Sequence, residues 1–131
     1  MIVVDASAVL ELLLNGRAAT RLRARLLAAG QTLHAPELID LEVLQVLRRF
    51  VRDRDLSLDR ATEALSDYRD LGIDRFSHEL LLGRVWELRA NLTAYDAAYV
   101  ALAELLDAPL LTADHRLARS PGHHAKIELI S

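Results

Sequence analysis

Short apolar runs alternate with longer segments of helical periodicity along this chain. In the longer segments apolar residues recur three and four positions apart, which predicts amphipathic helices, and the short runs rich in Val, Ile and Leu predict strands. The predicted strands are 2–4, 32–35, 73–76, 110–112 and 127–130, and the predicted helices are 6–14, 17–29, 37–52, 58–71, 78–90, 95–106 and 114–119. Gly16, Gly30 and Gly72 fall at predicted breaks.

The order of these elements predicts an α/β fold built on a parallel sheet, because parallel strands need long crossover connections. The first predicted strand is wholly apolar, as expected for a strand that is covered on both faces. We therefore expect a three-layer α/β/α sandwich with a four- to five-stranded parallel sheet. The length of 131 residues fits a single domain over 1–131. In such folds ligands bind beyond the carboxyl ends of the strands.

Composition narrows the class of protein. The chain has no cysteine, which excludes disulfides and Cys-based zinc sites. The longest later apolar run, 97–103, is far shorter than the roughly 20 residues that span a bilayer, so we expect no membrane association. With no signal-peptide pattern at the N-terminus, a cytoplasmic location is expected. The formal net charge of −3 argues against binding nucleic acid by overall charge alone.

Acidic residues supply the candidate chemistry. Asp5 directly follows the first predicted strand, and Asp114 comes two residues after the strand 110–112. If these strands are neighbours, both carboxylates lie at one edge of the sheet. Asp96 lies in the first turn of a helix, and Glu42 lies among apolar residues within the helix 37–52. Two helices and two strand ends thus direct acids toward one edge.

Each acid also has a purely structural interpretation. Asp5 and Asp114 are good N-caps for the helices that follow them, and Asp96 completes a capping-box pattern that begins at Thr93. Glu42 lies at the border of the apolar face, where a carboxylate can reach water. Asp40 competes with Glu42, and it is either an acid that supports the site or a partner of a neighbouring loop.

Several carboxylates in one cleft repel one another. At an effective dielectric near 20, two unit charges ~4 Å apart repel by about 4 kcal/mol. The cluster must therefore take up protons or bind a cation. Hard oxygen ligands without cysteine favour Mg²⁺ or Mn²⁺, and such ions activate water and stabilise the charge on a phosphodiester during cleavage. The pattern therefore favours phosphoryl-transfer chemistry.

Four segments in order along the chain resemble the motifs of the PIN-domain family, and more narrowly of VapC toxins. These segments are 2–9, 36–44, 93–103 and 110–118. The resemblance implies a Mg²⁺- or Mn²⁺-dependent endoribonuclease that acts on RNA, forms a homodimer and pairs with a VapB-type antitoxin in a type II toxin–antitoxin system. It also implies the site residues. Asp5, Glu42, Asp96 and Asp114 would be the catalytic, metal-binding acids, and Ser7, Thr112 and Asp40 would be supporting polar residues.

Alternatives remain open at this point. The chain could be an aspartyl-phosphate phosphatase or a phospho-receiver domain, since both use an Asp at a strand end. However, the dehalogenase-like phosphatases require a second Asp where this chain has Ser7, and Lys126 precedes the last strand, whereas a receiver places its lysine after one. A non-catalytic PIN-like binding module is the second alternative. Two arginine groups, in 17–25 and 48–54, would contact RNA, an acidic antitoxin tail or only solvent.

Overall fold

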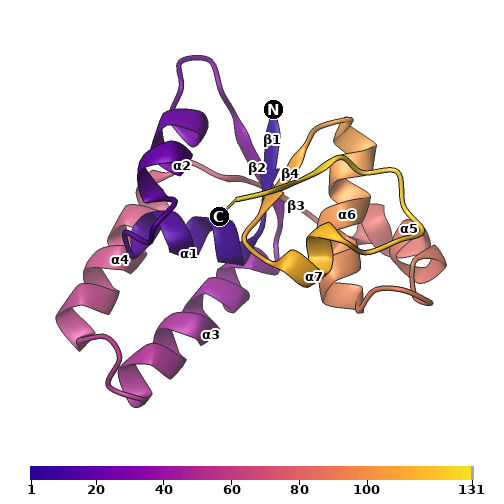
Figure 1. Cartoon of the computed structure of the whole chain (residues 1–131). Helices are drawn as coiled ribbons and strands as arrows, with labels where there is room; N and C mark the ends of the chain where they lie inside the picture. The colour runs from indigo at the N-terminus through magenta and orange to yellow at the C-terminus, as the bar shows by residue number, and fades with distance from the viewer. Residues whose placement is uncertain (131) are drawn as a thin grey trace.

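A parallel sheet forms the middle of the molecule (Figure 1). The structure is a computed structural model that describes residues 1–130. The strands are β1 (Ile2–Val4), β2 (Leu33–Pro36), β3 (Asp74–Phe76), β4 (Leu110–Thr112) and β5 (Ile127–Leu129). They are ordered β3-β2-β1-β4-β5, and every neighbouring pair is parallel. The predicted parallel sheet is thus confirmed with five strands.

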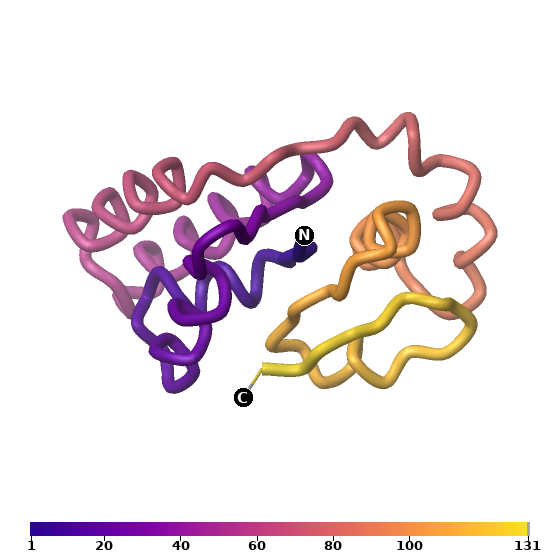
Figure 2. Tube along the Cα trace, turned by 90° about the horizontal axis from the view of Figure 1, so that it is seen from above, coloured from indigo at the N-terminus to yellow at the C-terminus, as the bar shows by residue number. Residues whose placement is uncertain are grey.

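Helices cover both faces of the sheet. On one side lie α1 (Ala6–Leu13), α2 (Ala19–Leu26), α3 (Ile39–Arg52) and α4 (Leu58–Asp70), and on the other lie α5 (Leu82–Glu87) and α6 (Ala94–Leu106). Helix α1 contacts β4 as well as its three neighbouring helices, whereas α6 contacts β1, β2 and β4. The short α7 (His115–Ala118) follows β4. Figures 1 and 2 show the two helical layers on opposite sides of the sheet, which confirms the α/β/α sandwich.

Burial follows the position of each strand in the sheet. All residues of β1 and β4 are buried, because these central strands have a helical layer on each face. The edge strands β3 and β5 are largely half-buried or exposed. The core therefore lies around β1 and β4, and it fixes the carboxyl ends of these two strands side by side. Among residues 1–130 no helix has the length and apolar character needed to cross a membrane.

Two predicted helices differ from the structure. The predicted helix 78–90 is divided into a 3₁₀ turn, η1 (His78–Leu81), and α5, which ends at Glu87. Ser77 caps this segment by accepting the N–H of Glu79, and the turn that follows is 3₁₀, which is tighter than an α-turn. The predicted helix 17–29 is shorter, because the side chain of Glu11 accepts the N–H of Ala18 and α2 begins only at Ala19.

Candidate acidic site

The carboxyl ends of β1 and β4 bring Asp5 next to the segment that carries Asp114. Val4 pairs in register with Leu111, so the two chains leave the sheet side by side. Asp5 caps α1 by accepting the N–H of Ala8 at 2.9 Å. Asp114 caps α7 by accepting the N–H of Arg116 at 2.8 Å. Asp5 and Asp114 therefore each cap a helix and also lie at the same edge of the sheet.

Two hydroxyl groups join these strand ends. Thr112 Oγ1 donates to Asp5 Oδ2 at 2.5 Å and accepts the N–H of Asp114 at 3.0 Å. Ser7 Oγ donates to Asp5 Oδ1 at 2.7 Å and accepts the N–H of Ala113 at 2.9 Å. Thr112 is fully buried and Asp5 is buried. The Asp5 carboxylate is therefore held by both oxygens, and its position is coupled to the start of the Asp114 loop.

Glu42 is held by a residue on the opposite helical layer. Its Oε1 accepts a hydrogen bond from the hydroxyl of Tyr99 at 2.5 Å, although Glu42 lies on α3 and Tyr99 is buried on α6. From the sequence, Tyr99 was interpreted as a packing residue. The available signal was its place three residues after Asp96, on the same helical face.

The pKa values of Asp5 and Glu42 are both raised by this arrangement. Burial raises the pKa of Asp5 above its usual value; the Ser7, Thr112 and Ala8 hydrogen bonds oppose this, and the negative charge of Asp114 adds to it. Burial also raises the pKa of Glu42; the Tyr99 hydrogen bond opposes the rise, and the charges of Asp5 and Asp96 add to it. The four acids thus lie near enough for their charges to disfavour one another.

Asp96 interacts with an arginine that the sequence reasoning missed. Thr93 caps α6 by accepting the N–H of Asp96 at 3.1 Å, as the capping pattern suggested. The Asp96 carboxylate accepts a hydrogen bond from Arg116, and the distance between Arg116 Nη2 and Asp96 Oδ2 is 2.7 Å. The same nitrogen lies 3.3 Å from Asp114 Oδ2. Arg116 thus bridges two acids from α6 and the β4–α7 loop, and no local pattern in the sequence indicates this contact.

Asp40 is held by other elements. Its Oδ1 accepts from the hydroxyl of Tyr68 at 2.6 Å, and Arg75 Nε donates to both of its oxygens at 2.8 and 3.0 Å. Among the described residues it makes no hydrogen bond to Asp5, Glu42 or their partners. Asp40 therefore ties α3 to α4 and β3, so its partners lie on a helix and a strand rather than on a neighbouring loop.

The donor chemistry of the site fits a hard divalent ion, because every candidate ligand is a carboxylate oxygen. The arrangement is more open than a metal shell: over residues 1–130 no group of three or more His, Asp or Glu side chains is gathered closely enough to hold an ion. Asp96 and Asp114 are instead drawn to Arg116. The ligand set therefore fits in kind, and the side chains would have to move to close around an ion.

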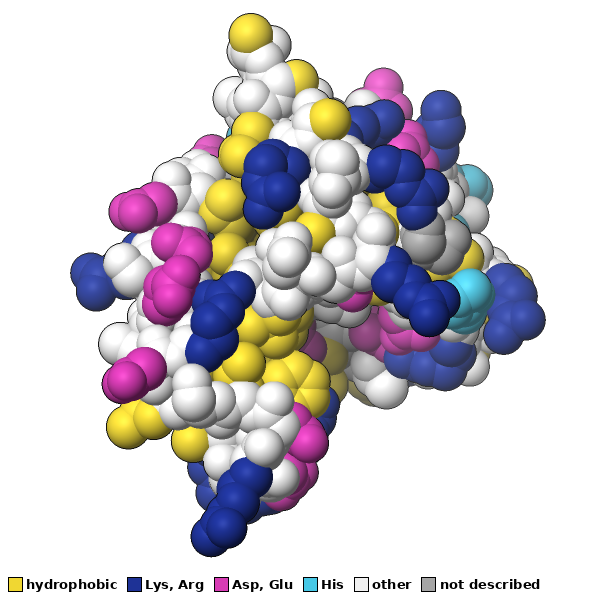
Figure 3. Space-filling view, turned by 60° about the vertical axis from the view of Figure 1, so that its left-hand side comes forward, with side chains coloured by type: hydrophobic (Ala, Val, Ile, Leu, Met, Phe, Trp, Pro, Cys, Tyr) yellow, Lys and Arg dark blue, Asp and Glu magenta, His cyan; other side chains and the backbone are white. Residues whose placement is uncertain are grey.

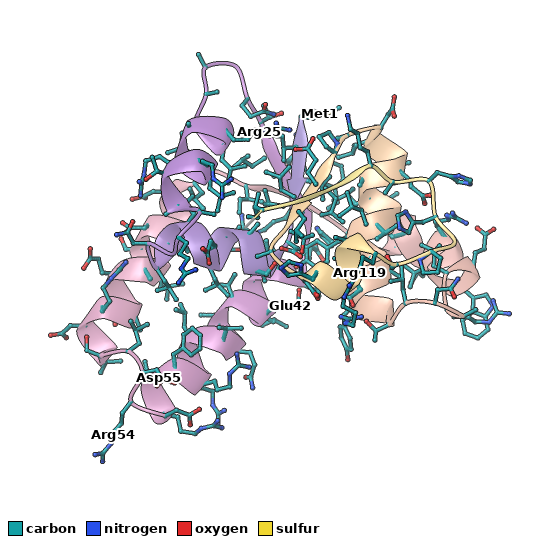
Figure 4. The ribbon with its side chains drawn as sticks, in the orientation of Figure 1. Met1, Arg25, Glu42, Arg54, Asp55 and Arg119 are labelled. Carbon is teal, nitrogen blue, oxygen red and sulfur yellow. The ribbon has the colours of Figure 1, made fainter. Side chains whose placement is uncertain are left out.

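Arg25 and Arg54, one from each of the two arginine groups, lie away from the acids. Figure 4 places Glu42 toward the end of the molecule where Arg119 follows α7, whereas Arg25 and Met1 both lie toward the opposite end. Arg54 lies at the far tip of the α3–α4 hairpin in the same view. Arg25 also pairs with Glu128 on β5 at 3.0 Å. These two arginines do not line the acidic edge.

Comparisons with known proteins agree with the fold and the motifs. The family model described as PIN domain matches residues 2–122. A VapC ribonuclease of Mycobacterium bovis is 48% identical over 118 residues, covering 90% of this chain and 89% of that protein. Ribonuclease VapC12 of Mycobacterium tuberculosis is 40% identical over 131 residues, covering 100% of both chains. The solved structure of VapBC2 from Rickettsia felis, bound to a DNA fragment from its promoter, has a TM-score of 0.73 at 13% identity, with 100% of both chains covered.

Proposed function

From the premise that the chain belongs to the PIN-domain family, we propose that it is the endoribonuclease toxin of a type II toxin–antitoxin pair of the VapBC kind. The observation that carries this proposal is the joined end of β1 and β4, where Thr112 binds Asp5 and the backbone of Asp114 together. Glu42 and Asp96 add charge to the same region. An edge that concentrates carboxylates suits the binding of divalent cations, which neutralise the negative charge on a phosphodiester during cleavage.

PIN-domain ribonucleases depend on a metal ion in general, and the proposed ion here is Mg²⁺ or Mn²⁺. Asp5, Glu42, Asp96 and Asp114 would hold it, since their oxygens are of the hard type that such ions prefer. When bound, the ion would lower the pKa of water and stabilise the charge that develops on the scissile phosphate. Ser7 and Thr112 would act as positioning residues, because they orient both oxygens of Asp5.

Glu42 is suited to moving a proton. Its Oε1 is bound by Tyr99, which leaves Oε2 for a water molecule or an ion. A carboxylate whose pKa is raised is a stronger proton acceptor than an ordinary one once it is ionised. We assign Glu42 the role of accepting the proton of the attacking water, with Tyr99 fixing the direction of its carboxylate.

A cognate VapB-type antitoxin is the proposed protein partner. Between α3 and α4 lies an open groove of about 500 Å³. Leu44, Leu47 and Val51 line it, and Arg48 and Arg52 lie at its rim. Figure 3 shows exposed apolar side chains on this face of the molecule, with basic and acidic side chains around them. This surface suits a segment with apolar anchors and acidic flanks, as the arginine group in 48–54 led us to consider.

The proposed assembly is a homodimer. A homodimer is supported by the exposed apolar side chains of Leu41 on α3 and Tyr95 on α6, which a second copy would cover. Sedimentation of the purified chain tests whether it is a dimer.

A cytoplasmic place of action follows from a cellular RNA substrate. Residues 1–131 would form one PIN domain.

An RNA-cleavage assay tests the activity. The purified chain, Asp5→Asn and Asp96→Asn are compared on structured RNA with added Mg²⁺ or Mn²⁺, and with EDTA. Both variants should lose at least about a hundredfold in rate, as expected when a group that acts on the transition state is removed. Asp67→Asn serves as the control, because Asp67 is an exposed acid on α4. Full activity in both site variants would overturn the assignment.

The alternatives predict different outcomes. An aspartyl-phosphate enzyme needs an attackable carboxylate, but Asp5 is buried and hydrogen-bonded at both oxygens. Treatment with a small phosphodonor should therefore leave Asp5 unmodified. A non-catalytic binding module would bind RNA and the metal ion without producing new RNA ends.

A further inference from the structure

Arg116 is the cation that occupies the acidic site in this structure. Its Nη2 lies 2.7 Å from Asp96 Oδ2 and 3.3 Å from Asp114 Oδ2, so a single nitrogen bridges two acids. These are two of the four carboxylates assigned to the metal ion above. The guanidinium and a divalent ion oppose each other at these carboxylates, because two cations repel and each neutralises negative charge that would attract the other.

The Arg116 side chain is free to leave. It is 64% exposed, whereas the side chains of Asp96 and Asp114 are 20% and 34% exposed. Ion pairs with so exposed a partner hold weakly, since water and salt screen them. The Asp114 carboxylate is also held by the backbone N–H groups of Arg116 and Leu117, which do not depend on the guanidinium. The backbone of Asp96 is fixed by Thr93, which accepts its N–H.

We infer that Arg116 is a built-in competitor of the divalent ion: it pairs with Asp96 and Asp114, and the ion binds those carboxylates fully only when the Arg116 side chain has moved away from them. This inference rests on the proposed function, since it concerns the same metal site. Its observation is the position of Arg116 Nη2 between two of the four acids, within 3.3 Å of both Asp96 Oδ2 and Asp114 Oδ2. The metal affinity of the toxin is therefore set partly by its own arginine.

Titration calorimetry with Mn²⁺ at low ionic strength and neutral pH tests the inference on the full chain. Arg116→Ala should bind Mn²⁺ with a Kd about two- to fivefold lower than the wild-type chain, the range expected when a weak ion pair no longer competes. Arg116→Lys, which keeps the charge without the planar fork, should lie between the two. Arg119→Ala is the matched control, an exposed arginine on the same segment, and should behave as wild type.

A second measurement uses the unaltered protein. Here the titrated ion is diamagnetic Mg²⁺ in place of Mn²⁺. As Mg²⁺ is added, the Nε–H signal of Arg116 in a nitrogen-15 NMR spectrum should shift, while that of Arg119 stays in place. A Kd for Arg116→Ala equal to or higher than that of wild type, with an unmoved Arg116 signal, would overturn the inference. If the wild-type chain binds no divalent ion at all, the proposed function itself fails, so the two failures are distinguishable.

Discussion

Thr112 donates a hydrogen bond to Asp5 across 107 positions of sequence, and the distance between Thr112 Oγ1 and Asp5 Oδ2 is 2.5 Å. The same hydroxyl oxygen accepts the N–H of Asp114. One buried side chain at the end of β4 therefore sets the position of an acid after β1 and of an acid after β4. The geometry of the site depends on the packing of two central strands rather than on any loop.

The first prediction concerns this hydroxyl. Thr112→Val keeps the shape of the side chain but leaves Asp5 Oδ2 without its donor and the N–H of Asp114 without its acceptor. We expect a loss of about 2–3 kcal/mol in the free energy of unfolding, because buried polar groups then stay unpaired. Thr112→Ser keeps the hydroxyl and should lose only about 1 kcal/mol for the missing buried methyl group. Urea unfolding of both variants measures the difference, and equal losses would contradict it.

The second prediction concerns charge repulsion in the absence of metal. The pKa values of Asp5 and Glu42 are raised in the folded chain, so ionisation of these groups lowers stability as the pH rises above the ordinary values of 3.8 and 4.5. At neutral pH in EDTA, Asp5→Asn and Glu42→Gln should each raise the melting temperature by about 3–6 °C, or about 1 kcal/mol for a chain of this size. Differential scanning calorimetry measures this.

Glu104 supplies the opposite case as a control. Its Oε1 and Oε2 accept from Arg84 at 2.7 and 3.0 Å, and this pairing lowers the pKa of Glu104. Its charge therefore stabilises the fold above the pKa of the unfolded chain. Glu104→Gln should lower the melting temperature under the same conditions. A drop in all three variants would argue against a crowded acidic site.

The third prediction concerns the pH dependence of activity. Tyr99→Phe removes the hydrogen bond that opposes the rise in the pKa of Glu42. The pKa of Glu42 should then rise further, and the acidic limb of the RNA-cleavage profile should move to higher pH. Tyr95→Phe is the control, because Tyr95 is 67% exposed and lies one turn earlier on α6. Identical acidic limbs for Tyr99→Phe and the wild-type chain would remove Glu42 from the proton-transfer role.

The fourth prediction separates the two acids at the start of α3. Asp40→Asn weakens the contacts with Tyr68 and Arg75, so it should cost about 1 kcal/mol of stability and leave the Kd for Mn²⁺ within twofold of wild type. Glu42→Gln should raise that Kd at least about tenfold, because a charged oxygen ligand is lost. Calorimetry on both variants decides which acid belongs to the metal site. A large effect of Asp40→Asn on the Kd would reverse the assignment.

Much of the fold could be predicted from local patterns. The apolar run of Ile2–Val4 and the run of Leu110–Thr112 mark central strands, and the helices between strands require parallel pairing. Asp5 and Asp114 were expected at one edge because residues that end neighbouring parallel strands must lie together. The division of the segment after Ser77 into η1 and α5 was missed, since it depends on how the turn is capped.

The sequence by itself determined the order of strands and helices, the parallel sheet and the edge where Asp5 and Asp114 lie, because these follow from periodicity and chain connectivity. Only the tertiary structure decided the partners of the side chains. On the same helix α3, Glu42 pairs with Tyr99 of α6, whereas Asp40 pairs with Tyr68 of α4 and Arg75 of β3. The pairing of Arg116 with Asp96 likewise joins two elements whose packing no local pattern encodes.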